Sequence, residues 1–231
     1  TPGLANKLSL PFVSTFFTTF PETVNSVKQK AKVRCAGPVI SPRLFNGSKE
    51  KGAEFAGLDA AKPTIMFIGG SLGAKSLNNA VQKNLEKLLA KYQVIHIAGK
   101  NGFNPNLKGR GYVQYEYVDK ELKDLMALSD VVISRAGSNA IFELASLNKP
   151  MILVPLPNTS SRGEQSLNAR NFKAKGFAEI IADENIADEK TLLTAIEETY
   201  TRKSQYIANM QQNPVKTTTV EELCRIITAD E

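Results

Sequence analysis

The sequence predicts an α/β protein with a Rossmann-like, doubly wound parallel sheet. Two observations predict it. From residue 64 onward, short apolar runs rich in β-branched residues alternate with longer amphipathic stretches, and Gly-containing turns follow several of the apolar runs. Strands that are apolar throughout are typical of a parallel sheet covered on both faces, and strand–helix alternation is typical of a doubly wound sheet.

Six strands are predicted in this region, with helical patterns between most of them. The strands are Thr64–Ile68, Gln93–Ala98, Tyr112–Tyr117, Val131–Ser134, Met151–Pro155 and Ala178–Ile181. The helices are Ala74–Lys91, Lys120–Ser129, Ser138–Leu147, Gln165–Lys175 and Asp188–Tyr200. The connection between the second and third strands is rich in Gly and Asn, so we expect a loop there.

The residues before the sheet have a different pattern. Phe16–Phe20 and Lys32–Ala36 are predicted strands, and a short helix begins at Pro21. Two strands and a short helix cannot form a stable core alone, so we expect residues 1–36 to be the end of a preceding domain. Without Met at position 1, the chain is expected to be a fragment. The following ranges are predicted: an interdomain linker at 37–62 with a helix at Lys49–Ala56, the ligand-binding domain at 63–213, and a C-terminal helix at 214–231 that can pack back on the first domain.

Composition narrows the classes of partner. With 29 basic and 23 acidic residues, the net charge is +6, which suits an anionic partner such as a nucleotide diphosphate or an anionic membrane face. The aromatic platforms and Arg-rich stripes of nucleic-acid binders are missing.

No run approaches the roughly 20 apolar residues of a membrane span, and no signal peptide is recognised. Cys35 and Cys224 are expected to be free thiols, and His96, inside an apolar strand, a satisfied core residue.

The strongest motif is a Gly-rich turn between the first predicted strand and its helix. It contains Gly69, Gly70, Ser71 and Gly73. Glycines let the backbone turn sharply and approach a ligand, and the following helix N-terminus favours a phosphate. The alternative is a tight turn with no ligand. A P-loop is excluded because Ala74 separates Gly73 from Lys-Ser, and NAD binding is disfavoured because the second strand does not end in an acid.

Two further motifs follow later strands. Ser134 to Glu143 forms a strand end, a Gly turn and a helix start, in which Ser138 or Asn139 can cap the helix and Glu143 can accept hydrogen bonds from vicinal hydroxyls. A polar loop from Pro155 then leads to Gln165 and Asn168, whose amides can donate to sugar hydroxyls or phosphate oxygens. The alternative to a ligand-binding Glu143 is a solvent-exposed glutamate on a helix, and the alternative to a ligand-binding polar loop is an exposed loop with no ligand. All three motifs lie at the carboxyl edge of the sheet, where open α/β sheets bind ligands.

Taken together, these segments resemble the bacterial MurG family of glycosyltransferases. The matching stretches are Gly69–Ala74, Glu116–Val118, Ser134–Glu143, Ser161–Gln165, Leu167–Ala169 and, near the start, Thr1–Lys7. The resemblance implies the two-domain GT-B fold, with residues 1–36 from the acceptor domain and 63–213 as the UDP-sugar donor domain. It also implies donor contacts by the following residues: Gly70, Ser71 and Gly73 at the diphosphate, Val118 at the uracil through its backbone, Ser138, Asn139 and Ala140 at the phosphates, Glu143 at the ribose, and Glu164, Gln165 and Asn168 at the sugar or phosphate.

The resemblance also implies an activity. The family transfers N-acetylglucosamine, with inversion, from UDP-N-acetylglucosamine to the 4-hydroxyl of lipid-linked N-acetylmuramyl-pentapeptide during peptidoglycan synthesis. It needs no cofactor and no metal in the donor site, and it works peripherally at the cytoplasmic face of the cell membrane on an undecaprenyl-diphosphate-linked acceptor. The presumed catalytic base lies upstream of this chain, so no catalytic residue is expected here. The family commonly has an arginine in its interdomain linker, close to the donor. In this sequence that arginine is displaced or replaced, and whether Arg43 takes its place is left open. The alternatives are another UDP-sugar glycolipid transferase and a non-catalytic nucleotide-sugar-binding subunit.

Overall fold

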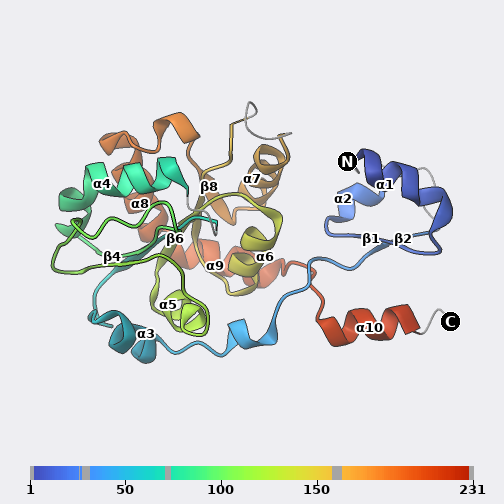
Figure 1. The fold of residues 1–231 in the computed structure, drawn as a ribbon, viewed down its shortest axis with the longest axis horizontal. Helices are drawn as coiled ribbons and strands as arrows, with labels where there is room; N and C mark the ends of the chain where they lie inside the picture. The colour runs from blue at the N-terminus through green and yellow to red at the C-terminus, as the bar shows by residue number, and fades with distance from the viewer. Residues whose placement is uncertain (1–2, 26, 28–31, 71–73, 158–162, 229–231) are drawn as a thin grey trace. The chain divides into compact units, whose positions relative to one another are not determined.

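The computed structural model describes residues 3–25, 27, 32–70, 74–157 and 163–228 (Figure 1). The chain divides into two compact units. Unit 1 comprises Thr1–Ser41 and Val215–Glu231, and unit 2 comprises Pro42–Pro214. Residues 42–62 of the predicted linker therefore belong, by their contacts, to the unit that carries the large sheet.

Unit 2 contains a parallel sheet with the strand order β5-β4-β3-β6-β7-β8. The strands are β3 (Thr64–Ile68), β4 (Gln93–Ile97), β5 (Tyr112–Tyr115), β6 (Val131–Ser134), β7 (Met151–Leu153) and β8 (Ala178–Ile180). Every neighbouring pair is parallel. The strand order reverses between β3 and β6, as in the dinucleotide-binding type of doubly wound sheet, and ligands bind at the carboxyl side of such a switch point. The predicted fold class is confirmed.

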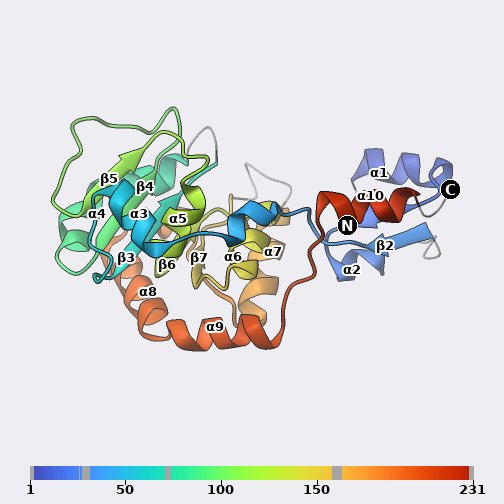
Figure 2. The same ribbon diagram turned by 90° about the horizontal axis from the view of Figure 1, so that it is seen from below.

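Helices cover both faces of this sheet. The helices α4 (Lys75–Leu89) and α8 (Glu189–Thr201) lie on one side, and α3 (Lys49–Ala56) and α5 (Leu122–Leu128) lie on the other (Figures 1 and 2). The other α-helices in the described part of this unit are α6 (Ser138–Ser146), α7 (Glu164–Ala174) and α9 (Lys203–Gln212). A loop joins β4 to β5, as predicted.

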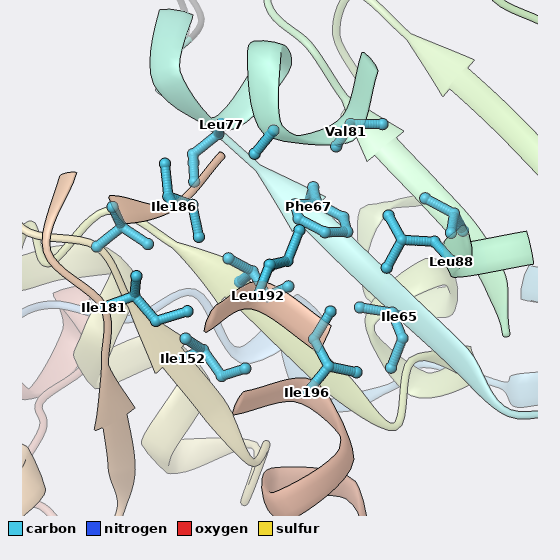
Figure 3. Close-up of a cluster of buried hydrophobic side chains, with 14 of the residues drawn as sticks. Ile65, Phe67, Leu77, Val81, Leu88, Ile152, Ile181, Ile186, Leu192 and Ile196 are labelled. Atoms are coloured by element: carbon cyan, nitrogen blue, oxygen red, sulfur yellow. The ribbon is translucent and has the colours of Figure 1, made fainter. Parts of the chain in front are cut away.

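The core under α4 and α8 is built from alternate strand residues. Ile65 and Phe67 of β3 point toward α4 and α8, where they meet the side chains labelled in Figure 3. Met66, between them, is equally buried and belongs to the opposite face, because successive strand side chains alternate. Each fully buried aliphatic or Phe side chain contributes about 1.5–3 kcal/mol. These two layers hold the strand ends in fixed positions, and the cleft described below is built on those ends.

The helix α3 packs closely on α5. It begins after Ser48, whose hydroxyl accepts a hydrogen bond from the Lys51 N–H at 3.3 Å, and it ends at Gly57, which has the left-handed φ of +63°. In its middle, Gly52 is buried, and a Cβ there would lie 2.2 Å from the carbonyl oxygen of Asp124 on α5. The predicted helix at Lys49–Ala56 is therefore a packed element of unit 2.

Unit 1 contains short elements. The strands β1 (Phe16–Thr18) and β2 (Val33–Cys35) pair in parallel, accompanied by α1 (Leu4–Ser9), α2 (Pro21–Val24) and α10 (Val220–Thr228). An isolated bridge joins Val39 to Thr218, so the two chain segments of this unit run side by side. Cys35 and Cys224 are free thiols. Within the described ranges, no helix is long and apolar enough to cross a membrane.

Candidate functional site

A cleft of about 1250 Å³ opens at the carboxyl edge of the unit 2 sheet. Its walls come from the turn after β3, the first turns of α4, the loop after β4, the turn between β6 and α6, the segment after β7 and the segment after β8. The predicted site residues Gly70, Ala140 and Gln165 line it. Three segments far apart in the sequence therefore meet where the strand-end argument placed them.

The N-terminal turn of α4 forms one wall of the cleft. Gly69 donates from its N–H to the carbonyl of Ile97 at 3.3 Å, and the space around a Cβ on Gly70 is open. Ala74 is the N-cap and supplies no side-chain cap, while Ala74, Lys75 and Ser76 line the cleft. Uncapped N–H groups and the positive end of the helix dipole suit a phosphate. Ser71 and Gly73, predicted to contact the diphosphate, lie outside the described residues.

The second motif forms the N-terminus of α6, and its cap is Gly137. The prediction that Ser138 or Asn139 caps this helix is wrong. Gly137 has the extended φ and ψ of an N-cap, and Ser138 is already the first helical residue. The Ser138 hydroxyl oxygen is buried with no hydrogen-bond partner among the described residues, whereas Asn139 is exposed. An uncapped second helix N-terminus therefore faces the same cleft through Gly137 and Ala140.

Glu143 lies in the second turn of α6 and is half-buried. Burial raises the pKa of its carboxyl above the ordinary value. No hydrogen bond or ion pair of this side chain is formed with the part of the chain that the structure describes. A partly desolvated carboxylate without a partner is a strong acceptor for hydroxyl groups. Glu143 is not among the residues that line the cleft in its present form.

The third motif places its amides in different roles. The Gln165 carbonyl oxygen accepts from the Leu156 N–H at 3.1 Å, which fixes the segment after β7. The Asn168 amide donates to the Ala136 carbonyl at 3.1 Å and so ties α7 to the turn after β6. Glu164 is exposed at the start of α7. Gln165 lines the cleft, whereas Asn168 and Glu164 do not.

Two more residues named from the sequence lie elsewhere. Val118 follows β5 at the carboxyl edge and is buried. Among the described residues, its backbone N–H and C=O form no hydrogen bond. Arg43 is exposed in a short 3-10 helix at Pro42–Phe45 and does not line the cleft, while the nearby Ile40 is buried.

Sequence reasoning missed an ion-pair network in the wall of the cleft. The Arg135 guanidinium donates from Nη1 to the Asp183 carboxylate at 2.5 Å and from Nη2 to the Ser76 hydroxyl at 2.8 Å. Ser76 donates in turn to the same Asp183 oxygen at 2.5 Å. Asp183 follows β8, so the rule that located the other motifs, polar residues just after a strand end, would have found it.

A second network reaches the cleft through Asn78. His96, buried in β4, contacts the Tyr112 hydroxyl from Nδ1 and the Asn78 carbonyl oxygen from Nε2, both at 2.9 Å. The Asn78 amide nitrogen donates to the Ala98 carbonyl at 3.0 Å, so its oxygen must be the acceptor for Nε2–H. Desolvation lowers the pKa of His96 to about 4. The expectation of a satisfied core histidine is confirmed.

Comparison with known proteins gives a consistent assignment. The model of the glycosyltransferase family 28 C-terminal domain matches residues 64–224. Two proteins named UDP-N-acetylglucosamine--N-acetylmuramyl-(pentapeptide) pyrophosphoryl-undecaprenol N-acetylglucosamine transferase are similar to the chain: 46% identity for Geobacillus kaustophilus and 45% for Clostridium botulinum (strain Loch Maree), each over 92% of the chain. The chain spans 59% and 60% of their lengths.

A solved structure supports the fold. The crystal structure of Acinetobacter baumannii MurG superposes with a TM-score of 0.69 at 20% sequence identity, over 99% of this chain and 64% of that one. At this level of identity the likeness concerns the fold alone.

Proposed function

The chain belongs to glycosyltransferase family 28 and carries its C-terminal domain, and on this premise we propose that unit 2 binds a UDP-sugar donor in the cleft at the carboxyl edge of its sheet. One observation carries the proposal. The uncapped N-termini of α4 and α6 converge on one cleft at the switch point of the sheet. Such an arrangement stabilises a diphosphate without requiring a basic side chain for each charge.

The residues around the cleft suit the parts of a nucleotide sugar. The diphosphate would lie against the first turns of α4 and α6, with the buried Ser138 hydroxyl available as a donor. The half-buried carboxylate of Glu143, which has no partner among the described residues, would accept from the two ribose hydroxyls. The backbone of Val118 would pair with the uracil edge, and Gln165 would contact the sugar or a phosphate. When the sugar leaves, the same helix N-termini would stabilise the charge that develops on UDP.

We propose that the parent enzyme transfers N-acetylglucosamine to the lipid-linked N-acetylmuramyl-pentapeptide. The names of the 45–46% identical relatives supply both the donor sugar and the acceptor. An undecaprenyl-diphosphate acceptor is held in a bilayer, so the enzyme would work as a peripheral protein at the cytoplasmic membrane face. The 231-residue chain is expected to bind the donor weakly and to turn over poorly, because its relatives are longer. Near-normal transfer by this chain alone would contradict that expectation.

The central test is titration with UDP, UDP-N-acetylglucosamine and UDP-galactose by calorimetry. Glu143→Ala is expected to weaken UDP binding about 10- to 100-fold, because a hydrogen bond to a charged group contributes about 1.5–3 kcal/mol. The pKa of Glu143 is raised, so its carboxylate is protonated at a higher pH than that of an ordinary glutamate. As the pH is lowered, wild-type binding should therefore begin to weaken above the pH range in which an ordinary glutamate titrates. Glu198→Ala, an exposed glutamate on α8, serves as the matched control. Unchanged affinity in Glu143→Ala would refute the ribose assignment.

The same titration addresses the alternatives. Preference for UDP-galactose over UDP-N-acetylglucosamine would favour another UDP-sugar glycolipid transferase. A non-catalytic binding subunit would bind the donor but give no transfer in any longer form of the protein that includes the missing part of the relatives.

A further inference from the structure

The Arg135 guanidinium is committed to contacts within the protein. Its Nη1 donates to Asp183 and also to the Val154 carbonyl at 3.1 Å, and its Nη2 donates to Ser76. The side chains of Arg135 and Asp183 are only 15% and 20% exposed. A charge pair in such a partly desolvated setting is stronger than the same pair in water. The cation is therefore neutralised by the protein itself before any ligand arrives.

The network joins four separate pieces of the cleft. Arg135 follows β6, Val154 follows β7, Asp183 follows β8, and Ser76 lies in the first turn of α4. The side chains of Ser76, Arg135 and Asp183 all line the cleft. The first turn of α4 is the turn whose N–H groups would meet a diphosphate, so its position relative to the strand ends determines the geometry of the phosphate site.

We propose that Asp183, Arg135 and Ser76 form a positioning network that holds the first turn of α4 against the ends of β6, β7 and β8, with Asp183 as its essential anion. This inference rests on the proposed donor-binding function. In this assignment Arg135 stabilises the protein and does not bind the ligand. The negative charge of the ligand is then stabilised by the helix N-termini and by Lys75, which lines the same cleft and is exposed. The competing assignment is direct binding of the diphosphate by Arg135.

The two assignments predict opposite results for Asp183→Asn. In a positioning network, Asp183→Asn and Arg135→Gln each weaken UDP binding by about tenfold or more, and the double variant is no worse than the worse single variant, because coupled residues act as a unit. If Arg135 binds the diphosphate, Asp183→Asn frees its charge and UDP binds as tightly as to wild type, or more tightly. That result would overturn the proposal.

Salt dependence and a conservative rescue sharpen the comparison. Salt screens a direct charge–charge contact, so loss of a phosphate-binding Arg135 would flatten the salt dependence of UDP binding. A positioning role leaves that dependence as in wild type. Ser76→Ala should weaken UDP binding, and Ser76→Thr, which keeps the hydroxyl, should restore most of it. A flattened salt dependence in Arg135→Gln, or equal affinities of the Ser76 variants and wild type, would count against the network.

A measurement without ligand separates this inference from the proposed function. Asn78 donates its N–H to the Ala74 carbonyl at 2.9 Å in the first turn of α4. Hydrogen exchange at this amide should accelerate severalfold in Asp183→Asn and in Arg135→Gln, because local opening becomes easier. Lys91→Gln, which breaks an exposed ion pair with Glu197 elsewhere in unit 2, is the control and should leave exchange unchanged. If wild type binds no UDP, the proposed function fails, and the exchange data still decide on the network. Unchanged exchange in both cleft variants would refute it.

Discussion

The imidazole of His96 is enclosed by polar partners that fix its tautomer. Tyr112 donates its hydroxyl hydrogen to Nδ1, and Nε2–H donates to Asn78. A proton on Nδ1 would remove the acceptor that Tyr112 uses, and burial already disfavours the charge. Asn78 is therefore oriented from behind the cleft wall by a neutral, fully paired histidine.

Because His96 is the single histidine of the chain, its titration can be observed without assignment. We expect the ring protons to titrate by NMR near the pKa of about 4. The unfolded chain takes up this proton near pH 6.5 and the folded chain only near 4, so stability falls as the pH drops between these values. The full loss is on the order of 3 kcal/mol. Urea unfolding from neutral to acid pH measures it, with His96→Gln as the comparison, and an ordinary pKa near 6.5 would contradict the structure.

The site was predictable where glycines and strand ends coincide. Gly70, Ala140 and Gln165 line the cleft because each follows a parallel strand, and that rule needs only the sequence. The pairing of Arg135 with Asp183 was not predictable, since it depends on side-chain directions from two loops far apart in the chain. The cap of α6 was predicted at Ser138 or Asn139, one or two residues after the observed Gly137, because Gly, Ser and Asn are all acceptable N-caps.

At the scale of elements, the strands were predictable and some helices were not. The strands of unit 2 are mostly apolar runs, whereas α9 is polar apart from a few positions. Its buried residues are Tyr206 and Met210, which are 3% and 2% exposed. Two apolar residues four positions apart are too weak a periodicity to predict a helix. Likewise α1 has no buried residue, so tertiary packing imposes no apolar pattern on its sequence that could predict the helix.

The packing of α3 on α5 makes a prediction about Gly52. Gly52→Ala would place a Cβ 2.2 Å from the Asp124 carbonyl oxygen, which is part of the α5 backbone and cannot move alone. We expect a loss of about 1–3 kcal/mol in the free energy of unfolding, or more, as for other overpacked sites. Gly57→Ala is the control, because its surroundings are open and only its left-handed φ is strained. Denaturant unfolding measures both, and equal stability of Gly52→Ala and wild type would show that the helices separate freely.

At the scale of the whole molecule, the two units differ greatly in their cores. Unit 2 has two covered sheet faces, whereas the buried apolar side chains among the described residues of unit 1 are few: Leu10, Val27, Ala36 and Ile40. We expect a chain of residues 42–214 to fold alone and to unfold cooperatively. Its thermal midpoint should lie within a few degrees of the main transition of the full chain, because the sheet and the helices that cover it all belong to unit 2. Calorimetry of both proteins measures this, and a fragment without a transition would show that unit 2 needs unit 1.

The bridge between Val39 and Thr218 bears on the order of events during translation. The Ile40 N–H donates to the Thr218 carbonyl, and the Thr218 N–H donates to the Pro38 carbonyl, both at 3.0 Å. Unit 2 is thus inserted into unit 1, and the ribosome makes all of it before Thr218 leaves the exit tunnel. Domains fold largely as they emerge, so the sheet of unit 2 can close before Thr218 is available to pair with residues 38–40. Residues 38–40 thus reach their partner only after the whole of unit 2 has been synthesised.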